Sequence, residues 1–332
     1  WDEEFNGELT YEPVKTYPLA PDPSAIAEGV RMLLEAKNPI LWAGQGVLYA
    51  EASEAVARLA ELIPAPVMMT NPGKSAIPEN HPLSLGGSTR SRPRMVSEFM
   101  DRADLVFAIG SSLTITNFGP KVPSGKRIVH STNDPSDINK DYLADHAVIG
   151  DAKMVAEALI VEIKRQRGEA DFSAIQALRK DIATVKAGWI ADWKDHRTSE
   201  EVPINQYRVI QDLMDTIDRD NVIITHDSGS PREQMMSSWE STKAGSYMGW
   251  GKSTQLGYGL GINLGAKIAA PDKICINVMG DAAIGMTGMD LETASRNKIA
   301  TLTIVFNNSV MAAERDVLVL ATKKYGAMDV GG

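Results

Sequence analysis

The fold of this chain is decided by two stretches, Lys273-Ile-Cys-Ile-Asn-Val-Met-Gly-Asp281 and Ala300-Thr-Leu-Thr-Ile-Val-Phe-Asn-Asn308. Each is a short apolar run that ends abruptly at polar residues, as a buried β-strand does. The residues between them have helical apolar spacing, and Thr287, three residues before Asp290, resembles a helix-capping box. The unit has about the 30 residues of a strand–helix–strand crossover.

The crossover predicts where the polar ends of its two strands meet. Parallel neighbouring strands bring their carboxyl ends to one edge of a sheet, which is where such folds bind ligands. Asp281 and Asn308 would then lie close together. Carboxylate and carboxamide oxygens suit a hard cation such as Mg²⁺, which keeps positions open for ligand phosphates. The sequence therefore predicts a metal–diphosphate site at this edge.

Similar apolar runs alternate with helical spacing through most of the chain, including Pro39–Ala43, Leu105–Ile109 and Arg127–His130. Continuous apolar strands indicate a parallel sheet covered on both faces. We expect an α/β protein with two doubly wound parallel-sheet domains. The expected organisation is a linker at 1–23, a central domain at 24–167, a helical connection at 168–204 that includes residues 176–186 and 189–193, and a cofactor-binding domain at 205–332.

Composition excludes several classes of protein. A length of 332 residues fits two domains. A net charge of −9 argues against nucleic acid as a partner, because phosphate backbones need concentrated Lys and Arg. The single cysteine, Cys275, excludes an internal disulfide framework and favours a cytoplasmic location. No apolar run is long enough to cross a bilayer.

Gly280-Asp281-Ala282 followed by Asn307-Asn308 resembles the thiamine-diphosphate signature of the acetolactate synthase and pyruvate decarboxylase superfamily, although Ala282 stands where Gly is usual. The resemblance implies thiamine diphosphate and Mg²⁺ as cofactors. It further implies that Asp281 and Asn308 bind Mg²⁺ through side-chain oxygens and Val310 through its carbonyl.

Further segments extend the likeness. The run from Leu256 to Lys267 is similar to the family segment under the aminopyrimidine ring, and Asp227-Ser-Gly-Ser230 to the segment that meets the diphosphate. The cofactor contacts that the resemblance implies are Asp227, Gly229, Ser230, Thr254, Leu256, Gly280, Asp281, Ala282, Ala283 and Asn308. Met311 and Glu314, just after Asn308, are the candidates for facing the substrate.

The first block is similar to the central domain of acetolactate synthase-like enzymes, through residues 73–82 and 133–151. Some of these enzymes hold FAD there, near an Asp whose place is taken here by Thr132, so we expect an ADP-like ligand or an empty site in preference to FAD. Gly44-Gln-Gly46 after a strand suggests a different class, an NAD-dependent dehydrogenase, but Tyr49 stands where the third glycine belongs.

The family resemblance implies carbon–carbon bond cleavage or formation on a 2-oxo acid. Acetolactate synthase-like chemistry on pyruvate is the first expectation, and an oxalyl-CoA decarboxylase or 2-hydroxyacyl-CoA lyase acting on an acyl-CoA is the alternative. A non-catalytic nucleotide-binding protein is a further one. The family's activating glutamate lies in an N-terminal domain that this chain lacks, and the last domain is expected to continue past residue 332. The complete protein is therefore expected to be a homodimer or homotetramer, and this piece inactive alone.

Overall fold

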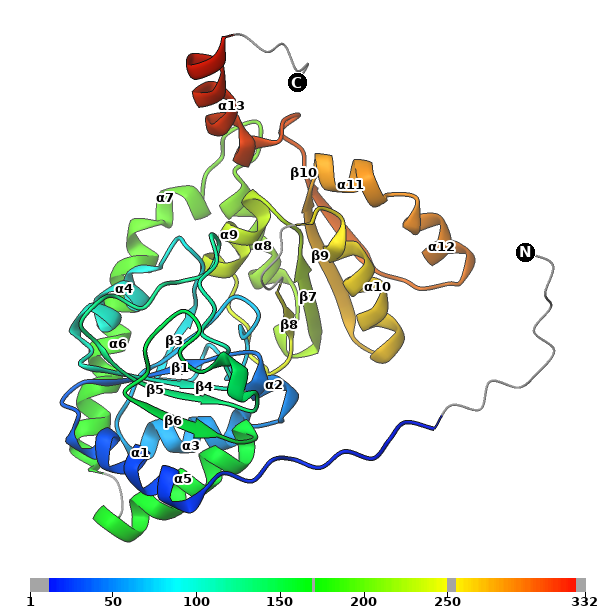
Figure 1. Ribbon diagram of the computed structural model, residues 1–332. Coiled ribbons are helices and arrows are strands. Elements are labelled where there is room, and N and C mark those ends of the chain that lie inside the picture. Colours follow the sequence, from blue (N-terminus) through cyan, green and yellow to red (C-terminus); the bar gives the residue numbers. More distant parts are fainter. Residues whose placement is uncertain (1–11, 169–170, 250–254, 327–332) are drawn as a thin grey trace.

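The computed structural model describes residues 12–168, 171–249 and 255–326, which form two parallel sheets with helices packed around them (Figure 1). This arrangement confirms the predicted α/β fold class. No helix in the described part of the chain is long and apolar enough to cross a membrane.

The first sheet has six parallel strands in the order β3-β2-β1-β4-β5-β6. Their bounds are β1 (Pro39–Ala43), β2 (Val67–Met69), β3 (Ser84–Gly87), β4 (Leu105–Ile109), β5 (Arg127–Thr132) and β6 (His146–Ile149). Every residue of β1, β2 and β4 is buried. These strands lie in the middle of the sheet and have helices on both faces, which explains why they are apolar at every position and do not alternate.

Helices cover both faces of this sheet (Figure 1). On one face, α1 (Pro23–Glu35), α3 (Ser53–Leu62) and α5 (Ala152–Arg167) pack against one another. On the other face lie α4 (Arg94–Arg102) and α6 (Phe172–Asp192). The short elements α2 (Gly46–Tyr49) and η1 (Pro135–Asp137) follow β1 and β5.

The segment predicted to be a helical connection between the domains contains one long helix. Helix α6 runs without a break from Phe172 to Asp192 and is followed by the single turn α7 (Lys194–Arg197). Ile182 on α6 is 3% exposed and belongs to the core of the first sheet. Arg102 of α4 donates to Asp181 at 2.6 Å, which holds α6 against the first sheet.

The second sheet has four parallel strands in the order β10-β9-β7-β8. Their bounds are β7 (Val222–His226), β8 (Tyr247–Met248), β9 (Ile274–Gly280) and β10 (Leu302–Phe306). The helical elements of this part are α8 (Gln206–Thr216), η2 (Arg219–Asn221), α9 (Ser230–Ser238), α10 (Tyr258–Ala269), α11 (Asp281–Thr287), α12 (Asp290–Arg296) and α13 (Ala312–Tyr325).

The predicted capping box at Thr287 is wrong. Helix α11 begins at Asp281, directly after β9, and Thr287 is its last residue. The Thr287 hydroxyl donates to the Ala283 carbonyl at 3.2 Å, and α12 begins without a side-chain cap. A short polar residue near a helix end can bond either forwards or backwards, and here the helix already under way accepts the bond.

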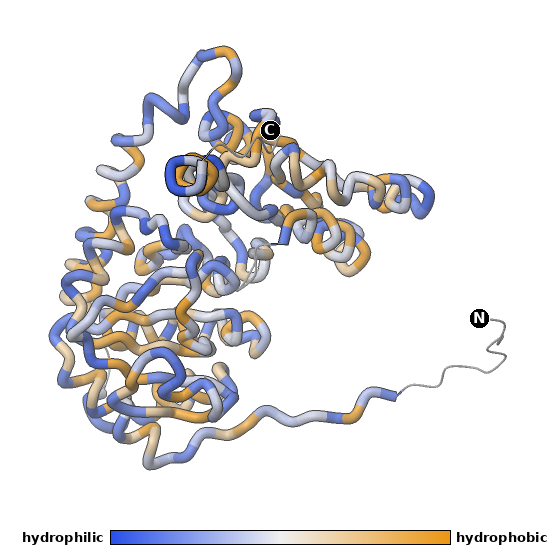
Figure 2. Tube along the Cα trace, turned by 45° about the horizontal axis from the view of Figure 1, so that its top comes forward, coloured by the Kyte–Doolittle hydropathy of each residue, from blue (hydrophilic) through white to orange (hydrophobic). Residues whose placement is uncertain are grey.

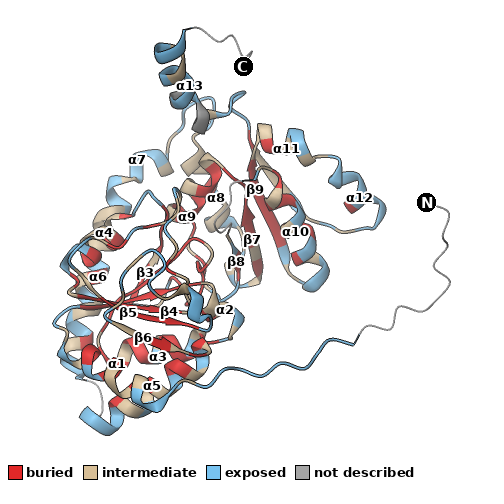
Figure 3. Cartoon of the chain, viewed as in Figure 1, coloured by how far each residue is buried: buried red, intermediate tan, exposed pale blue. Residues whose placement is uncertain are grey.

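The two parts differ in how fully their apolar residues are covered (Figure 3). Figure 2 shows hydrophobic residues along the helices around the second sheet, and several of their side chains are exposed. Met289 is 82% exposed, and Val317 and Leu320 on α13 are 60% and 65% exposed. Exposed apolar residues gathered on one part of a molecule indicate a face that another chain segment or subunit covers.

A buried lysine joins the two parts. Lys74 of the first part is 1% exposed, and its Nζ donates to both carboxylate oxygens of Glu79, at 2.6 and 2.7 Å. The same Nζ donates to the carbonyls of Met236 (3.1 Å) and Trp239 (2.8 Å) in the second part. A buried ammonium needs all of these acceptors to offset its lost hydration, so the contact holds the two parts in one orientation.

Candidate cofactor-binding site

The two strands singled out in the sequence lie side by side as predicted. Strands β9 and β10 are parallel neighbours, and Gly280 is paired with Phe306. Asp281 therefore follows one strand end directly, and Asn308 lies two residues beyond the other. Both residues line one cavity of about 180 Å³ at the carboxyl edge of the sheet.

Most residues predicted to contact the cofactor line this cavity. From the sequence-based set it contains Gly229, Ser230, Leu256, Gly280, Asp281, Ala282, Ala283, Asn308, Val310 and Met311. Four separate segments of the chain supply them, after β7, before α10, at the end of β9 and after β10. Thr254 and the side chain of Glu314 lie outside the described residues.

The local backbone presents oxygen atoms to the cavity. Asp281 Oδ1 accepts the N–H of Ala282 at 2.8 Å, and Asn308 Oδ1 accepts that of Val310 at 3.2 Å. The second bond closes a turn in which Ser309 has a φ of +55°. Both side chains are thus fixed by the backbone that follows them.

This donor set fits a small hard cation. One carboxylate, one carboxamide and a backbone carbonyl are oxygen ligands that Mg²⁺ accepts when phosphates and water complete its octahedron. The described residues contain no group of three or more His, Cys, Asp or Glu placed to hold a metal. A metal here would depend on a ligand's own oxygens, as a diphosphate provides.

Asp227 acts on the site from outside the cavity lining. It is 1% exposed, and its carboxylate accepts the N–H groups of Ser228 (2.8 Å), Gly257 (3.0 Å) and Gly259 (2.9 Å). These bonds join the end of β7 to the loop that leads into α10. The carboxylate thereby fixes the position of Leu256, which does line the cavity.

Gly257 is required where it stands. Its φ is +91°, and a Cβ there would lie 2.0 Å from Thr287 Cγ2 on α11. The loop under the cavity and the helix that begins at Asp281 therefore approach as closely as only glycine allows.

His226, next to Asp227, is part of the buried framework. It is 1% exposed, and its Nδ1 donates to the Asp227 carbonyl at 2.9 Å. Burial lowers the pKa of His226 to about 4, so the ring is neutral near pH 7. It does not line the cavity.

Seven lining residues lie outside the set predicted from the sequence: Phe118, Gln206, Ser228, Pro231, Arg232, Phe306 and Ala312. Phe118 comes from the first part of the chain, in the loop after β4. Arg232 follows Ser230 by two residues, and that closeness to a predicted contact is the signal that could have identified it. For Phe118 the sequence carries no comparable signal.

A larger cavity, of about 790 Å³, lies at the carboxyl edge of the first sheet. The lining residues include Gln45, Asn71, Ser111, Thr132 and Asp151. The glycines of Gly44-Gln-Gly46 are explained by packing, since a Cβ on Gly44 would lie 2.3 Å from the Gly110 carbonyl. This close approach accounts for them without a dinucleotide fingerprint.

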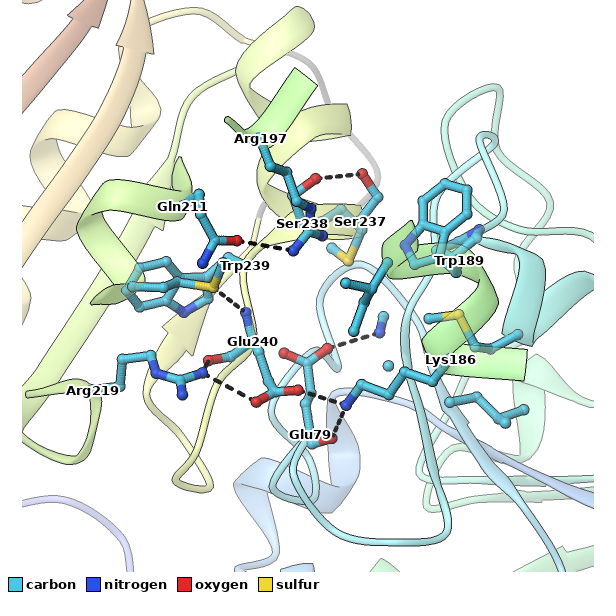
Figure 4. A pocket seen from close by; sticks show the side chains of 18 of the residues that line it. Glu79, Lys186, Trp189, Arg197, Gln211, Arg219, Ser237, Ser238, Trp239 and Glu240 are labelled. Atoms are coloured by element: carbon cyan, nitrogen blue, oxygen red, sulfur yellow. Dashed lines mark hydrogen bonds and ion pairs between the residues drawn. The ribbon is translucent and has the colours of Figure 1, made fainter. Parts of the chain in front are cut away.

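A third cavity, of about 260 Å³, lies between the two parts (Figure 4). Its charged side chains largely satisfy one another. Glu240 accepts from Lys186 at 2.5 Å and from Arg219 at 3.1 Å, and Lys186 also donates to the Glu79 carbonyl at 3.2 Å. These pairs link the two parts across the cavity, so we interpret it as part of the contact between them and not as a ligand site.

Comparison with known proteins agrees with this arrangement. The model of the thiamine pyrophosphate enzyme central domain matches residues 26–159, and that of the C-terminal TPP-binding domain matches residues 227–331. Together they cover the first sheet, strands β8 to β10 of the second sheet and most of the residues that line its cavity.

The chain is similar to several named enzymes. A probable acetolactate synthase large subunit of Methanococcus aeolicus is 28% identical over 302 residues, covering 87% of this chain and 49% of that protein. The acetolactate synthase large subunit of Buchnera aphidicola is 30% identical, and the match covers 86% of this chain and 49% of that protein. 2-Hydroxyacyl-CoA lyase 1 of Mus musculus is 27% identical, and the match covers 86% of this chain and 49% of that protein. The chain spans about half the length of these curated relatives and, carrying both matching domains in order, belongs to the thiamine pyrophosphate enzyme family.

Proposed function

We propose that the complete protein uses thiamine diphosphate and Mg²⁺ to cleave or form a carbon–carbon bond on a 2-oxo acid, in an acetolactate synthase-like decarboxylation and carboligation of pyruvate. One observation carries the proposal. Asp281 and Asn308 lie at the ends of paired strands and line one cavity together with Gly229, Ser230 and Leu256.

In this proposal each segment of the cavity has one task. The side chains of Asp281 and Asn308 and the carbonyl of Val310 would hold Mg²⁺ against the diphosphate. Gly229 and Ser230, together with residues 280–283, would bind the diphosphate oxygens through backbone N–H groups and the Ser230 hydroxyl. Bound thiamine diphosphate supplies the carbanion that attacks a carbonyl carbon.

The remaining walls orient the cofactor and keep water out. Leu256 would support the ring portion of the cofactor, and Asp227 holds that residue in place through Gly257 and Gly259. Phe118, Phe306 and Met311 add apolar surface. A lining of this kind excludes water from a reactive carbanion.

The acyl-CoA alternative has an observation of its own, the 27% identity to a 2-hydroxyacyl-CoA lyase. Oxalyl-CoA decarboxylase-like chemistry belongs to the same alternative. Met311 is 47% exposed and lines the cavity with the candidate metal ligands, and in this proposal it would face either kind of substrate. Glu314 stays a candidate on sequence grounds.

For the complete protein we infer a homodimer or homotetramer in the cytoplasm. An N-terminal domain would supply the activating glutamate, and the exposed apolar residues around the second sheet supply a surface for such a contact. The 332-residue chain alone is expected to bind cofactor without turning over a 2-oxo acid.

We infer that the cavity of the first sheet takes an ADP-like ligand, or none, in preference to FAD. Thr132 and Asp137 line it, and the Thr132 hydroxyl donates to Asp137 at 3.1 Å. The absorbance spectrum of the purified complete protein tests this, because bound flavin absorbs visible light and an adenine nucleotide does not.

The decisive experiment is pyruvate consumption by the complete protein, with and without thiamine diphosphate and Mg²⁺, with identification of the product. Cofactor-dependent acetolactate is the expected result. Tight Mg²⁺-dependent cofactor binding without turnover of pyruvate would move the proposal to acyl-CoA substrates. No cofactor binding at all would favour a non-catalytic nucleotide-binding protein.

A further inference from the structure

Arg232 is a buried cation in the wall of the candidate cofactor cavity. It lies on the first turn of α9, two residues after Ser230, and is 5% exposed. It lines the cavity together with Ser230 and Asp281. A guanidinium is rarely buried to this extent without a charged or strongly polar partner.

The contacts of Arg232 leave part of its guanidinium unused. Its Nε donates to Glu233 Oε1 at 3.1 Å, and the guanidinium stacks over the ring of Phe118 at 4.4 Å. Its Nη1 is buried and has no hydrogen-bond partner among the described residues. Glu233 also accepts a hydrogen bond from the hydroxyl of Thr89. The guanidinium is therefore held in place by Glu233 and Phe118, while its Nη1 remains available to donate a hydrogen bond to a ligand.

The charges of the cavity favour an anion at that edge. Among the described lining residues, the charged side chains are Arg232 and Asp281. If a cation occupies the site at Asp281, the cavity carries a net positive charge that a ligand must balance. The planar fork of an arginine matches the paired oxygens of a carboxylate or a phosphate.

We propose that Arg232 binds an oxyanion of the ligand that fills this cavity and that Phe118 acts as its positioning residue. The inference rests on the proposed function and adds a recognition element to it. Two oxyanions have the required chemistry, the diphosphate of the cofactor and the carboxylate of a 2-oxo acid. Because Phe118 comes from the central domain and Arg232 from the other, this recognition depends on how the two domains are docked.

The test is isothermal titration of the complete protein in Mg²⁺ with four probes: thiamine diphosphate, thiamine, inorganic pyrophosphate, and pyruvate added to the cofactor-loaded protein. The variants are Arg232→Met, which keeps the length of the side chain, and Arg232→Lys, which keeps its charge. Arg296→Met is the matched control, because Arg296 is 64% exposed and pairs with Glu292 on α12.

We expect Arg232→Met to reduce the affinity for at least one oxyanion probe by about tenfold or more. This is the loss typical of a charge-assisted hydrogen bond. Weaker thiamine diphosphate and pyrophosphate binding, with thiamine unchanged, assigns Arg232 to the diphosphate. Weaker pyruvate binding alone assigns it to the carboxylate. Arg232→Lys should lose less affinity than Arg232→Met in either case, and Arg296→Met should keep the wild-type affinity for every probe.

Phe118→Leu provides a second variant that keeps both charges and an apolar wall. It should weaken the same probe by a few-fold while leaving thermal unfolding nearly unchanged. Wild-type affinity for every probe in both Arg232→Met and Phe118→Leu would overturn the inference. If the complete wild-type protein failed to bind thiamine diphosphate, that result would contradict the proposed function instead, so the two failures can be told apart.

Discussion

The carboxylate of Asp227, at the end of β7, accepts the backbone N–H of Gly259 in the first turn of α10 at 2.9 Å. The bond joins a strand end to a helix start 32 positions later in the chain. Together with the bonds to Gly257 and Ser228, it makes Asp227 the link between two of the segments that line the candidate cofactor cavity.

Replacement of Asp227 by Asn should destabilise the chain and weaken cofactor binding. A carboxamide has one accepting oxygen where the carboxylate has two, so at least one buried N–H is left unpaired. We expect a loss of about 2 kcal/mol in the free energy of unfolding, measured with urea. Asp212→Asn is the control, since Asp212 is 50% exposed and pairs with Arg208 on the surface of α8. Equal stability of the two variants would contradict the role given to Asp227.

Glycine-to-alanine changes at Gly257 and Gly261 should act in opposite directions. At Gly257 the φ of +91° and the contact with Thr287 should together cost about 2 kcal/mol or more. Gly261 lies inside α10, and a Cβ there would meet no atom within 4 Å. Alanine at that position should stabilise the chain by about 0.5–1 kcal/mol through helix propensity. Urea unfolding of both variants checks the pair.

Stability should fall in weak acid because of His226. Its pKa is lowered by burial from 6.5 to about 4, so below pH 6.5 the unfolded chain binds a proton that the folded chain does not. The free energy of unfolding therefore decreases as the pH falls from 6.5 towards 4, by up to about 3 kcal/mol from this group. Urea unfolding at several pH values should show a shallower slope for His226→Gln than for wild type. Parallel slopes would show that another group carries the effect.

Removal of the Asp281 carboxylate should uncouple cofactor binding from Mg²⁺. Asp281→Ala should bind thiamine diphosphate about tenfold or more weakly, with an affinity that EDTA no longer changes. The wild-type chain should lose affinity to a similar extent when EDTA is added. Asp290→Ala, an exposed change at the start of α12, should retain both affinity and EDTA sensitivity.

Replacement of Lys74 by Met should loosen the docking of the two domains. It leaves the Glu79 carboxylate buried without its cation, which costs about 3–5 kcal/mol in comparable pairs. The carbonyls of Met236 and Trp239 lose their donor in the same step. We expect unfolding that changes from one transition to two, followed by circular dichroism. Lys243→Met serves as control because Lys243 is 58% exposed. A single unshifted transition in Lys74→Met would refute this view of the interface.

Much of the site could be predicted because it depends on local patterns. The apolar runs that end at Asp281 and Asn308 specify strands, and a crossover of that length makes them parallel neighbours, as observed. Most predicted contacts line the resulting cavity. Helix boundaries were less predictable, because the same residues allow several hydrogen-bonding arrangements. Thr287 bonds back to Ala283 instead of capping the helix that follows it.

By itself the sequence determined the two α/β domains and the edge at which Asp281 and Asn308 meet, since both follow from apolar periodicity and from short connections. Tertiary structure alone decided that Phe118 reaches the cavity and stacks on Arg232, and that Asp227 holds the α10 loop from outside the lining. The physical reason is the separation along the chain of the residues that interact. Strands and crossovers are set by neighbours along the chain. Asp227 meets the α10 loop only once its own domain has folded, and Phe118 meets Arg232 only once the two domains have docked.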